Sequence, residues 1–257
     1  MAISVDTGSW YRFLNQFTIG VDGCIGIWLR LPNGVTTDNG FNFPMSSGTG
    51  GNAPNTSRYA AWGLDSGSPR AFVSSMYDSN GVGVFNYDWT LPEPNGVVDT
   101  WHLLVINKVG IRLDTYWVPI GAMSPPAPVG SATSIETDVV LQGMYIGRTD
   151  ELDSGEYNWR NEIAEFFVLD RFLTPEEILT LATGNNITAV EQSPVVNLQF
   201  LEASNIVPDI SGNGYDAIRT GSPTTVAHPF SYPISEGSAL TLNPLALVPS
   251  TLEALTL

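Results

Sequence analysis

Lysine, histidine and cysteine are nearly missing from this sequence of 257 residues. Lys108 is the only lysine, Cys24 is the only cysteine, and there are two histidines. A single cysteine excludes an intrachain disulfide, and so few Cys and His residues argue against a zinc site. We therefore expect Cys24 to be a small buried hydrophobic residue of a strand rather than a nucleophile.

Charged residues are also scarce, and most of them are acidic. Only 14% of the residues are charged, and 26 acidic against 10 basic residues give a formal net charge of −16. A surface of this sign repels nucleic acid phosphates and anionic lipid headgroups, which excludes nucleic acid and membrane surfaces as partners. The sequence has no apolar run of the roughly 18 residues that a membrane helix needs. Its first residues lack the basic stretch and apolar run of a signal peptide, so none is expected.

Short runs of alternating apolar and polar residues, separated by Gly, Pro, Asn and Asp, make up most of the remaining sequence. This pattern is typical of many short strands joined by turns. Residues 101–107 and 112–117, for example, are expected to form a hairpin. With 43% hydrophobic residues the chain can bury a sizeable core. Such strands cover each other as two packed layers, so we predict an all-β, antiparallel two-sheet sandwich.

One short α-helix is predicted near residues 175–183. Thr174 is a suitable N-cap, Pro175 stands at the first helical position, and Glu177 is placed to complete a capping box. Gly184 is a natural end for this helix, because glycine adopts the left-handed conformation at low cost.

The most specific pattern in the sequence lies at residues 145–148 and 161–178. These segments run Y-I-G-R and then N-E-I-A-E-F-F-V-L-D-R-F-L-T-P-E-E-I. The pattern resembles the laminin-G-like branch of the concanavalin A-like jelly-roll family, with Asn161 and Ala164 in place of the usual Gly and Asp. Residues 17–29, 101–117 and 195–217 are similar to other strands of the family. The resemblance implies a jelly-roll sandwich and leaves the function open, because this fold serves many functions.

We predict one jelly-roll domain over residues 1–235, followed by an apolar C-terminal segment at residues 236–257. From residue 240 onward the segment carries a single charge, Glu253, and it is rich in leucine. A soluble monomer rarely leaves so many leucines exposed. The segment is therefore expected to pack on the domain, as a final strand or otherwise, or on a neighbouring subunit.

Calcium is the cofactor that the resemblance implies, because laminin-G-like domains often hold Ca²⁺ at a loop edge. Asp209, Asn213 and Asp216 have the oxygen atoms that such a site needs. A structural role is the alternative: Asp209 would cap a turn by side-chain hydrogen bonds, and Asn213 with Gly214 would supply its positive φ.

Four aromatic residues are candidates for contacts with a glycan or a protein partner. They lie in or next to predicted loops that also contain Asn and Asp, and they are Trp62, Trp89, Tyr157 and Trp159. Aromatic faces hold sugar rings, and protein interfaces also bury them. Core packing is the third interpretation, and the sequence does not separate the three.

No catalytic residues are expected. Some glycosidases of this fold place Glu-x-Asp-x-x-Glu on one strand, but Glu162 and Glu165 are three residues apart and position 164 is alanine. In a regular strand this odd spacing puts the two carboxylates on opposite faces, one paired and buried and the other solvated. The sequence also has no nucleophile elbow, phosphate-binding loop or dinucleotide fingerprint.

We expect a non-catalytic structural or decoration protein of a virion, such as a bacteriophage head or tail, made in the host cytoplasm. The resemblance begins close to the initiator Met with no signal peptide before it, and the surface is poor in lysine. The expected partners are other virion proteins or copies of this chain, with glycan attachment as a further role. The alternative is a lectin-like carbohydrate-binding module assisted by calcium. A glycoside hydrolase is the third hypothesis and ranks below both.

Overall fold

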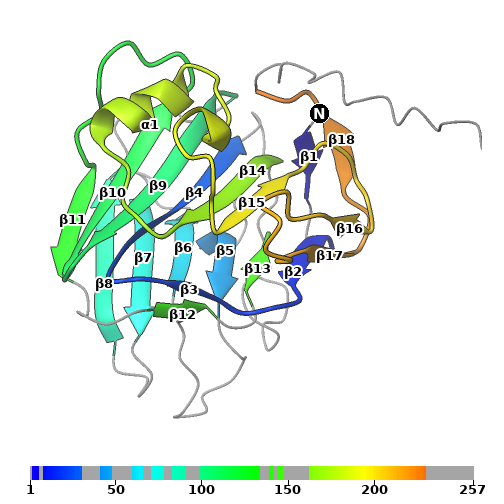
Figure 1. Ribbon diagram of the computed structural model, residues 1–257, viewed down its shortest axis with the longest axis horizontal. Coiled ribbons are helices and arrows are strands. Elements are labelled where there is room, and N and C mark those ends of the chain that lie inside the picture. The colour runs from blue at the N-terminus through cyan, green and yellow to red at the C-terminus, as the bar shows by residue number, and fades with distance from the viewer. Residues whose placement is uncertain are drawn as a thin grey trace, which may run out of the picture.

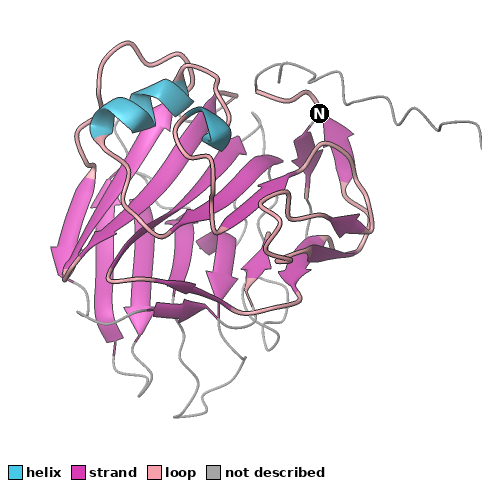
Figure 2. Cartoon of the chain, viewed as in Figure 1, coloured by secondary structure: helices cyan, strands magenta, loops and turns pink. Residues whose placement is uncertain are grey.

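Two antiparallel sheets packed face to face form the body of the protein (Figure 1). The computed structural model describes residues 2–5, 8–30, 41–47, 60–65, 71–77, 83–90, 99–133, 139–141, 144–147 and 162–229. Strands dominate this part of the chain, and its helical turns gather at one end of the molecule (Figure 2). This arrangement confirms the predicted all-β sandwich.

Sheet A has eight strands among the described residues. In spatial order they are β11 (Gly130–Thr133), β10 (Arg112–Pro119), β9 (Trp101–Val109), β4 (Asp22–Arg30), β14 (Glu162–Leu169), β1 (Ala2–Ser4) and β18 (Thr224–Val226), with β15 (Val196–Gln199) pairing β14 beside β1. β9 and β10 form the predicted hairpin, in which Leu104 pairs with Trp117.

Sheet B also has eight strands in the described part. They are β16 (Ile206–Val207), β17 (Ala217–Thr220), β2 (Trp10–Phe13), β13 (Tyr145–Ile146), β5 (Phe41–Ser47), β6 (Ala60–Asp65), β7 (Ala71–Tyr77) and β8 (Gly83–Thr90). A separate two-stranded ladder joins β3 (Phe17–Ile19) to β12 (Val139–Leu141).

Buried side chains form two layers, because sheet A is covered on both faces. The inner layer lies between the sheets and includes Ile27 and Leu29 of β4 together with Tyr11 and Phe13 of β2. The helix layer lies on the other face of sheet A, where Trp28 packs with residues of α1 (Pro175–Ala182) and η1 (Ile187–Ala189). Burial on both faces explains why β4 and β14 are nearly unbroken apolar runs.

Strand β14 contains a β-bulge that changes which face its residues occupy. Ile163 pairs with Leu29 and Phe166 pairs with Ile27, so Ala164 and Glu165 together stand opposite the single residue Trp28. One extra residue has therefore been inserted between two members of the inner layer.

Helix α1 has the ends that the sequence predicts. The Thr174 hydroxyl accepts a hydrogen bond from the Glu177 backbone N–H at 3.2 Å, and the Glu177 carboxylate accepts one from the Thr174 N–H at 2.9 Å. Gly184 follows the C-cap with φ of 98°. In the part of the chain that is described, neither helix has the length and hydropathy to cross a membrane.

The predicted domain boundary at residue 235 and the apolar segment 236–257 lie outside the described residues. The described chain ends at Pro229, shortly after β18. The domain division and the packing of the segment therefore stay predictions.

Candidate ligand-binding site

An open cavity of about 240 Å³ lies on the helix face of sheet A, beside the first turn of α1. Strands β9 and β10 form its floor, and the turn before the helix forms its wall. Its lining includes Asn107, Arg112, Asp114, Tyr116, Phe172 and Thr174. The volume is below the range of about 300–1,000 Å³ that is usual for drug-sized ligands, so the cavity suits one small ring.

The polar floor comes from alternation along β10, which places Arg112, Asp114 and Tyr116 on one face. Arg112 donates from Nε to Asp114 Oδ1 at 2.8 Å, and its Nη2 lies 2.7 Å from Oδ2. Ser131 Oγ donates to the same Oδ1 at 2.6 Å. The carboxylate is buried at 6% exposure, whereas 61% of the Arg112 side chain is exposed.

This pair keeps hydrogen-bonding capacity for a ligand. A guanidinium has five N–H donors, and Asp114 takes two of those of Arg112. A carboxylate has about four acceptor sites, and the contacts described above fill three of them in Asp114. The exposed Arg112 side chain can therefore donate hydrogen bonds to a ligand, while the buried Asp114 carboxylate holds it in place.

Asn107 fixes the wall of the cavity to its floor. Its Nδ2 donates to the Leu173 carbonyl at 2.6 Å, and its Oδ1 accepts from the Leu173 N–H at 3.1 Å. Burial raises the pKa of the neighbouring Tyr116, and the Asp114 carboxylate adds to this effect. The Arg112 charge and a hydrogen bond from Asn107 oppose it without cancelling it, so the phenol stays protonated. Phe172 is held at the rim, where it is 38% exposed.

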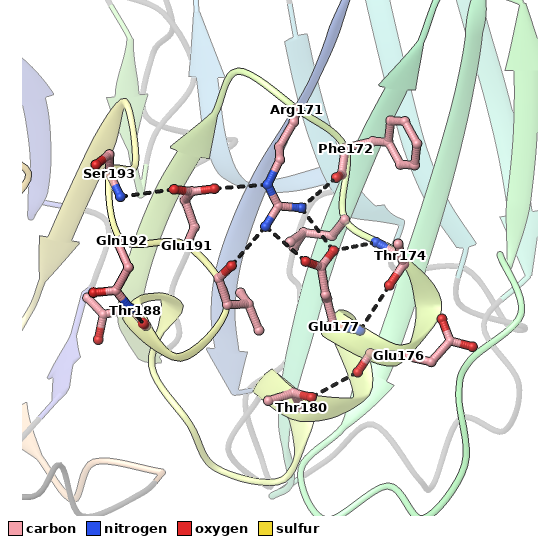
Figure 3. A network of polar contacts seen from close by, with 12 residues as sticks. Arg171, Phe172, Thr174, Glu176, Glu177, Thr180, Thr188, Glu191, Gln192 and Ser193 are labelled. Atoms are coloured by element: carbon pink, nitrogen blue, oxygen red, sulfur yellow. Dashed lines mark hydrogen bonds and ion pairs between the residues drawn. The ribbon is translucent and has the colours of Figure 1, made fainter.

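Arg171 ties this wall to both helices (Figure 3). It donates from Nη1 to Glu177 Oε2 and from Nε to Glu191 Oε2, both at 2.9 Å, and from Nη2 to the Val190 carbonyl at 2.8 Å. Its Nη1 also donates to the Phe172 carbonyl, and the Phe172 ring points away from the network. The rim of the cavity is thus built on a rigid support.

The three predicted calcium ligands lie together in one turn. Asp209 Oδ1 accepts from the N–H groups of Asn197 and Ser211, and Oδ2 accepts from the Ser211 hydroxyl and the Tyr215 N–H, at 2.7–3.0 Å. Asp216 Oδ1 accepts from the Asp209 N–H at 2.8 Å.

The third residue, Asn213, donates to the Pro194 and Val195 carbonyls. The oxygens of Asp209 therefore hold the turn together and do not fit an open calcium shell, which needs six to eight oxygen ligands. No cluster of three or more Asp, Glu, His or Cys residues suited to a metal occurs in the described ranges. Calcium binding by this chain stays a prediction.

Two of the four candidate aromatic residues lie in described strands of sheet B. Trp62 pairs with Met45 and with Ser74, and Trp89 pairs with Phe72, which lies two residues from Ser74. Tyr157 and Trp159 lie outside the described residues. Their role as glycan or interface contacts remains untested.

The prediction that Glu162 and Glu165 occupy opposite faces, with one of them solvated, is wrong. Both are buried, at 7% and 0% exposure. The bulge in β14 adds one residue between them, so both lie on the helix face of sheet A, together with Trp28 and Arg30. Arg30 Nη1 donates to Glu162 Oε2 at 2.9 Å, and burial raises the pKa of Glu162 against this opposing charge.

Five residues of this cavity were not predicted to be site residues: Asn107, Arg112, Asp114, Tyr116 and Phe172. One signal was available: charged or polar side chains alternate on the strand after the hairpin turn. Their proximity to residues 172–174 depends on where the helix returns over the sheet, and the local pattern does not contain that information.

No protein-family profile matches the chain, and no curated protein matches it in sequence. Among solved structures, a native heptameric SAP-like pentraxin from Limulus polyphemus aligns with a TM-score of 0.55 and 13% identity, over 90% of this chain and 97% of the other. A Bacteroides ovatus protein assigned as carbohydrate-binding aligns with a TM-score of 0.55 and 12% identity, over 90% of this chain and 62% of the other. The resemblance seen in the sequence is thus confirmed for the fold, which is a two-sheet jelly-roll sandwich.

Proposed function

We propose that this protein is a non-catalytic carbohydrate-binding module, and that the cavity between β10 and α1 holds one sugar ring. The observation that carries the proposal is that the Arg112–Asp114 pair and the partly exposed Phe172 line the same cavity. A sugar presents hydroxyl groups at its edge and apolar C–H groups on its face. The charged pair matches the first, and the aromatic ring matches the second.

Two observations support a binding role over a catalytic one. The structures that align at a TM-score of 0.55 are a pentraxin and a protein assigned as carbohydrate-binding. In addition, Glu162 is engaged by Arg30 and Glu165 is fully buried. Hydrolysis of a glycosidic bond needs two carboxylates that flank an accessible bond.

Self-association is the finer part of the proposal. The aligned pentraxin is heptameric, which supports a search for oligomers of this chain. A place in a virion, with virion proteins as partners, stays a prediction that rests on the sequence alone.

The test begins with the full chain on a glycan array in calcium-free buffer. A glycan that binds is then titrated calorimetrically against Phe172→Ala and Arg112→Met, with Met123→Ala as a control at an exposed position outside the cavity. We expect each cavity variant to raise the Kd about tenfold, which corresponds to about 1.4 kcal/mol. The control should bind like the unaltered chain. Equal binding by all three variants would overturn the assignment of this cavity, and retention of no glycan would overturn the function.

A further inference from the structure

A second, larger groove lies beside β15 and β16, away from the cavity next to α1. Its volume is about 330 Å³, and Gln199, Leu201, Glu202, Ser204, Pro208 and Ile210 line it. None of these residues belongs to the cavity beside α1. The groove therefore needs an explanation of its own.

The side chains around this groove are unusually apolar for a surface. Leu201 is 40% exposed and Ile210 is 51% exposed. On the adjoining hairpin, Ile206 and Ile218 form a cross-strand pair that is also exposed, at 51% and 38%. Covering apolar side chains that gather in one place removes them from water and stabilises the protein.

Hydrogen bonds hold the loop at residues 203–206, which borders the groove, in one conformation. Arg219 donates from its guanidinium to the Ala203 carbonyl and to Asn205 Oδ1, and its backbone N–H donates to the Asn205 carbonyl at 2.9 Å. Ser204 Oγ donates to the Ile206 carbonyl at 2.6 Å. A preformed apolar groove binds an apolar segment at a lower entropic cost than a groove that must be ordered first.

The chain leaves the described fold close to this groove. Strand β18 ends at Val226, which pairs with Ala2 of β1. The next residue of β1, Ile3, pairs with Ile163 of β14, and the neighbouring carbonyl of Ala164 accepts from the Phe200 N–H, one residue before Leu201. The segment that follows Pro229 spans roughly 90 Å when fully extended, so it is long enough to reach the groove without being fully extended.

The composition of that segment matches the groove. Its only charges are Glu236 and Glu253, so it brings little of the repulsion expected in a protein of net charge −16. Its leucines lie at short intervals and are Leu240, Leu242, Leu245, Leu247, Leu252, Leu255 and Leu257. We propose that the C-terminal segment 236–257 docks into the groove of its own chain and covers Leu201 and Ile210.

Thiol labelling tests this proposal in the full-length chain. Cys24 is buried, so the substitution Ile210→Cys introduces the one accessible thiol in the described part of the chain. Its labelling rate is compared with that in a second protein, in which Leu242, Leu245, Leu247, Leu252 and Leu255 are also replaced by Ser. We expect labelling to be at least tenfold slower when the leucines are present, because the docked segment covers the groove.

Ile111→Cys serves as the matched control, since Ile111 is 45% exposed and lies on the β9–β10 turn. Its labelling should not depend on the leucines. Equal rates at position 210 with and without the leucines would overturn the proposal. Protection that disappears on dilution would also overturn it and would assign the groove to the segment of a second copy. Glycan binding at the other cavity is independent of each result.

Discussion

The ring of His102 lies flat against the indole of Trp117, with ring centroids 4.6 Å apart and planes inclined by 8°. Both side chains are buried, and Nδ1 of His102 lies 3.0 Å from the Thr100 carbonyl. This histidine is therefore a packing residue of the β9–β10 hairpin, and its buried environment disfavours the charged form of the imidazole.

We expect His102 to make the protein less stable in mild acid. Burial lowers its pKa from 6.5 to about 4, against a smaller opposing effect of the Thr100 carbonyl. Below pH 6.5 the unfolded chain gains a proton that the folded chain does not, so stability is complete above this pH and falls toward pH 4. The loss amounts to about 3 kcal/mol at pH 4.

Chemical denaturation at pH 7 and pH 4 measures this loss in the unaltered chain and in His102→Phe. The phenylalanine keeps a ring against Trp117 but has no proton to bind, so its loss should be smaller by about that amount. Met123→Ala, at an exposed position with no titrating group, is the control and should lose stability like the unaltered chain. An imidazole NMR titration of His102 with a midpoint near 6.5 would contradict the prediction.

Asp209→Asn should lower the free energy of unfolding by about 2–4 kcal/mol, because the new amide group places donors against N–H donors in a buried turn. The same variant separates the structural role from calcium binding. If Asp209 only holds the turn, a chelator will leave the melting temperature of the unaltered chain unchanged. A rise in melting temperature with calcium that Asp209→Asn abolishes would assign a calcium site to this turn.

Gly26→Ala should cost about 1–3 kcal/mol through overpacking of the helix layer. A Cβ at this position would collide with the ring of Phe167, its cross-strand partner, so the ring would have to move. The double variant Gly26→Ala with Phe167→Leu should lose less than the sum of the two single changes. Strict additivity in thermal unfolding would show that the ring is not the obstacle.

Arg171→Gln should destabilise the helical end of the molecule by about 1–2 kcal/mol at neutral pH, since charge-assisted hydrogen bonds are lost from a partly exposed network. Burial alone would raise the pKa of Glu177, but hydrogen bonds from Arg171 and Thr174 outweigh it and lower that pKa. Hydrogen bonds from Ser193 and Arg171 lower the pKa of Glu191.

The contribution of this network is therefore complete above pH 4.5 and is lost as the pH falls through the lowered values. The difference between the unaltered chain and Arg171→Gln should shrink between pH 7 and pH 3. A difference that stays constant with pH would mean that packing, and not charge, is what Arg171 contributes.

Local patterns were sufficient to predict the all-β class, the β9–β10 hairpin and both ends of α1. Each depends on residues that are close in sequence, such as Thr174 with Glu177. The face of Glu165 could not be predicted in this way, because the bulge shows only in the pairing of β14 with β4, a strand more than a hundred residues away.

The candidate cavity could not be predicted from local sequence patterns for a related reason. Asn107, Asp114 and Phe172 come from two strands and a turn that meet only after α1 has returned over sheet A. The alternation of Arg112, Asp114 and Tyr116 marked a polar stripe. No neighbouring residue in the sequence indicated that the turn before α1 would cover this stripe and shield part of it from solvent.

The bulge in β14 determines which residues of this strand lie in the inner layer and which lie in the helix layer. Before it, odd-numbered residues such as Ile163 enter the inner layer, and after it even-numbered residues such as Phe166 and Val168 do so. Deleting Ala164 would leave Glu165 alone opposite Trp28, so Ile163 and Phe166 would keep their partners and their layers and the ladder would become regular. The bulge therefore admits one extra small residue into β14 while its neighbours on both sides stay in their own layers.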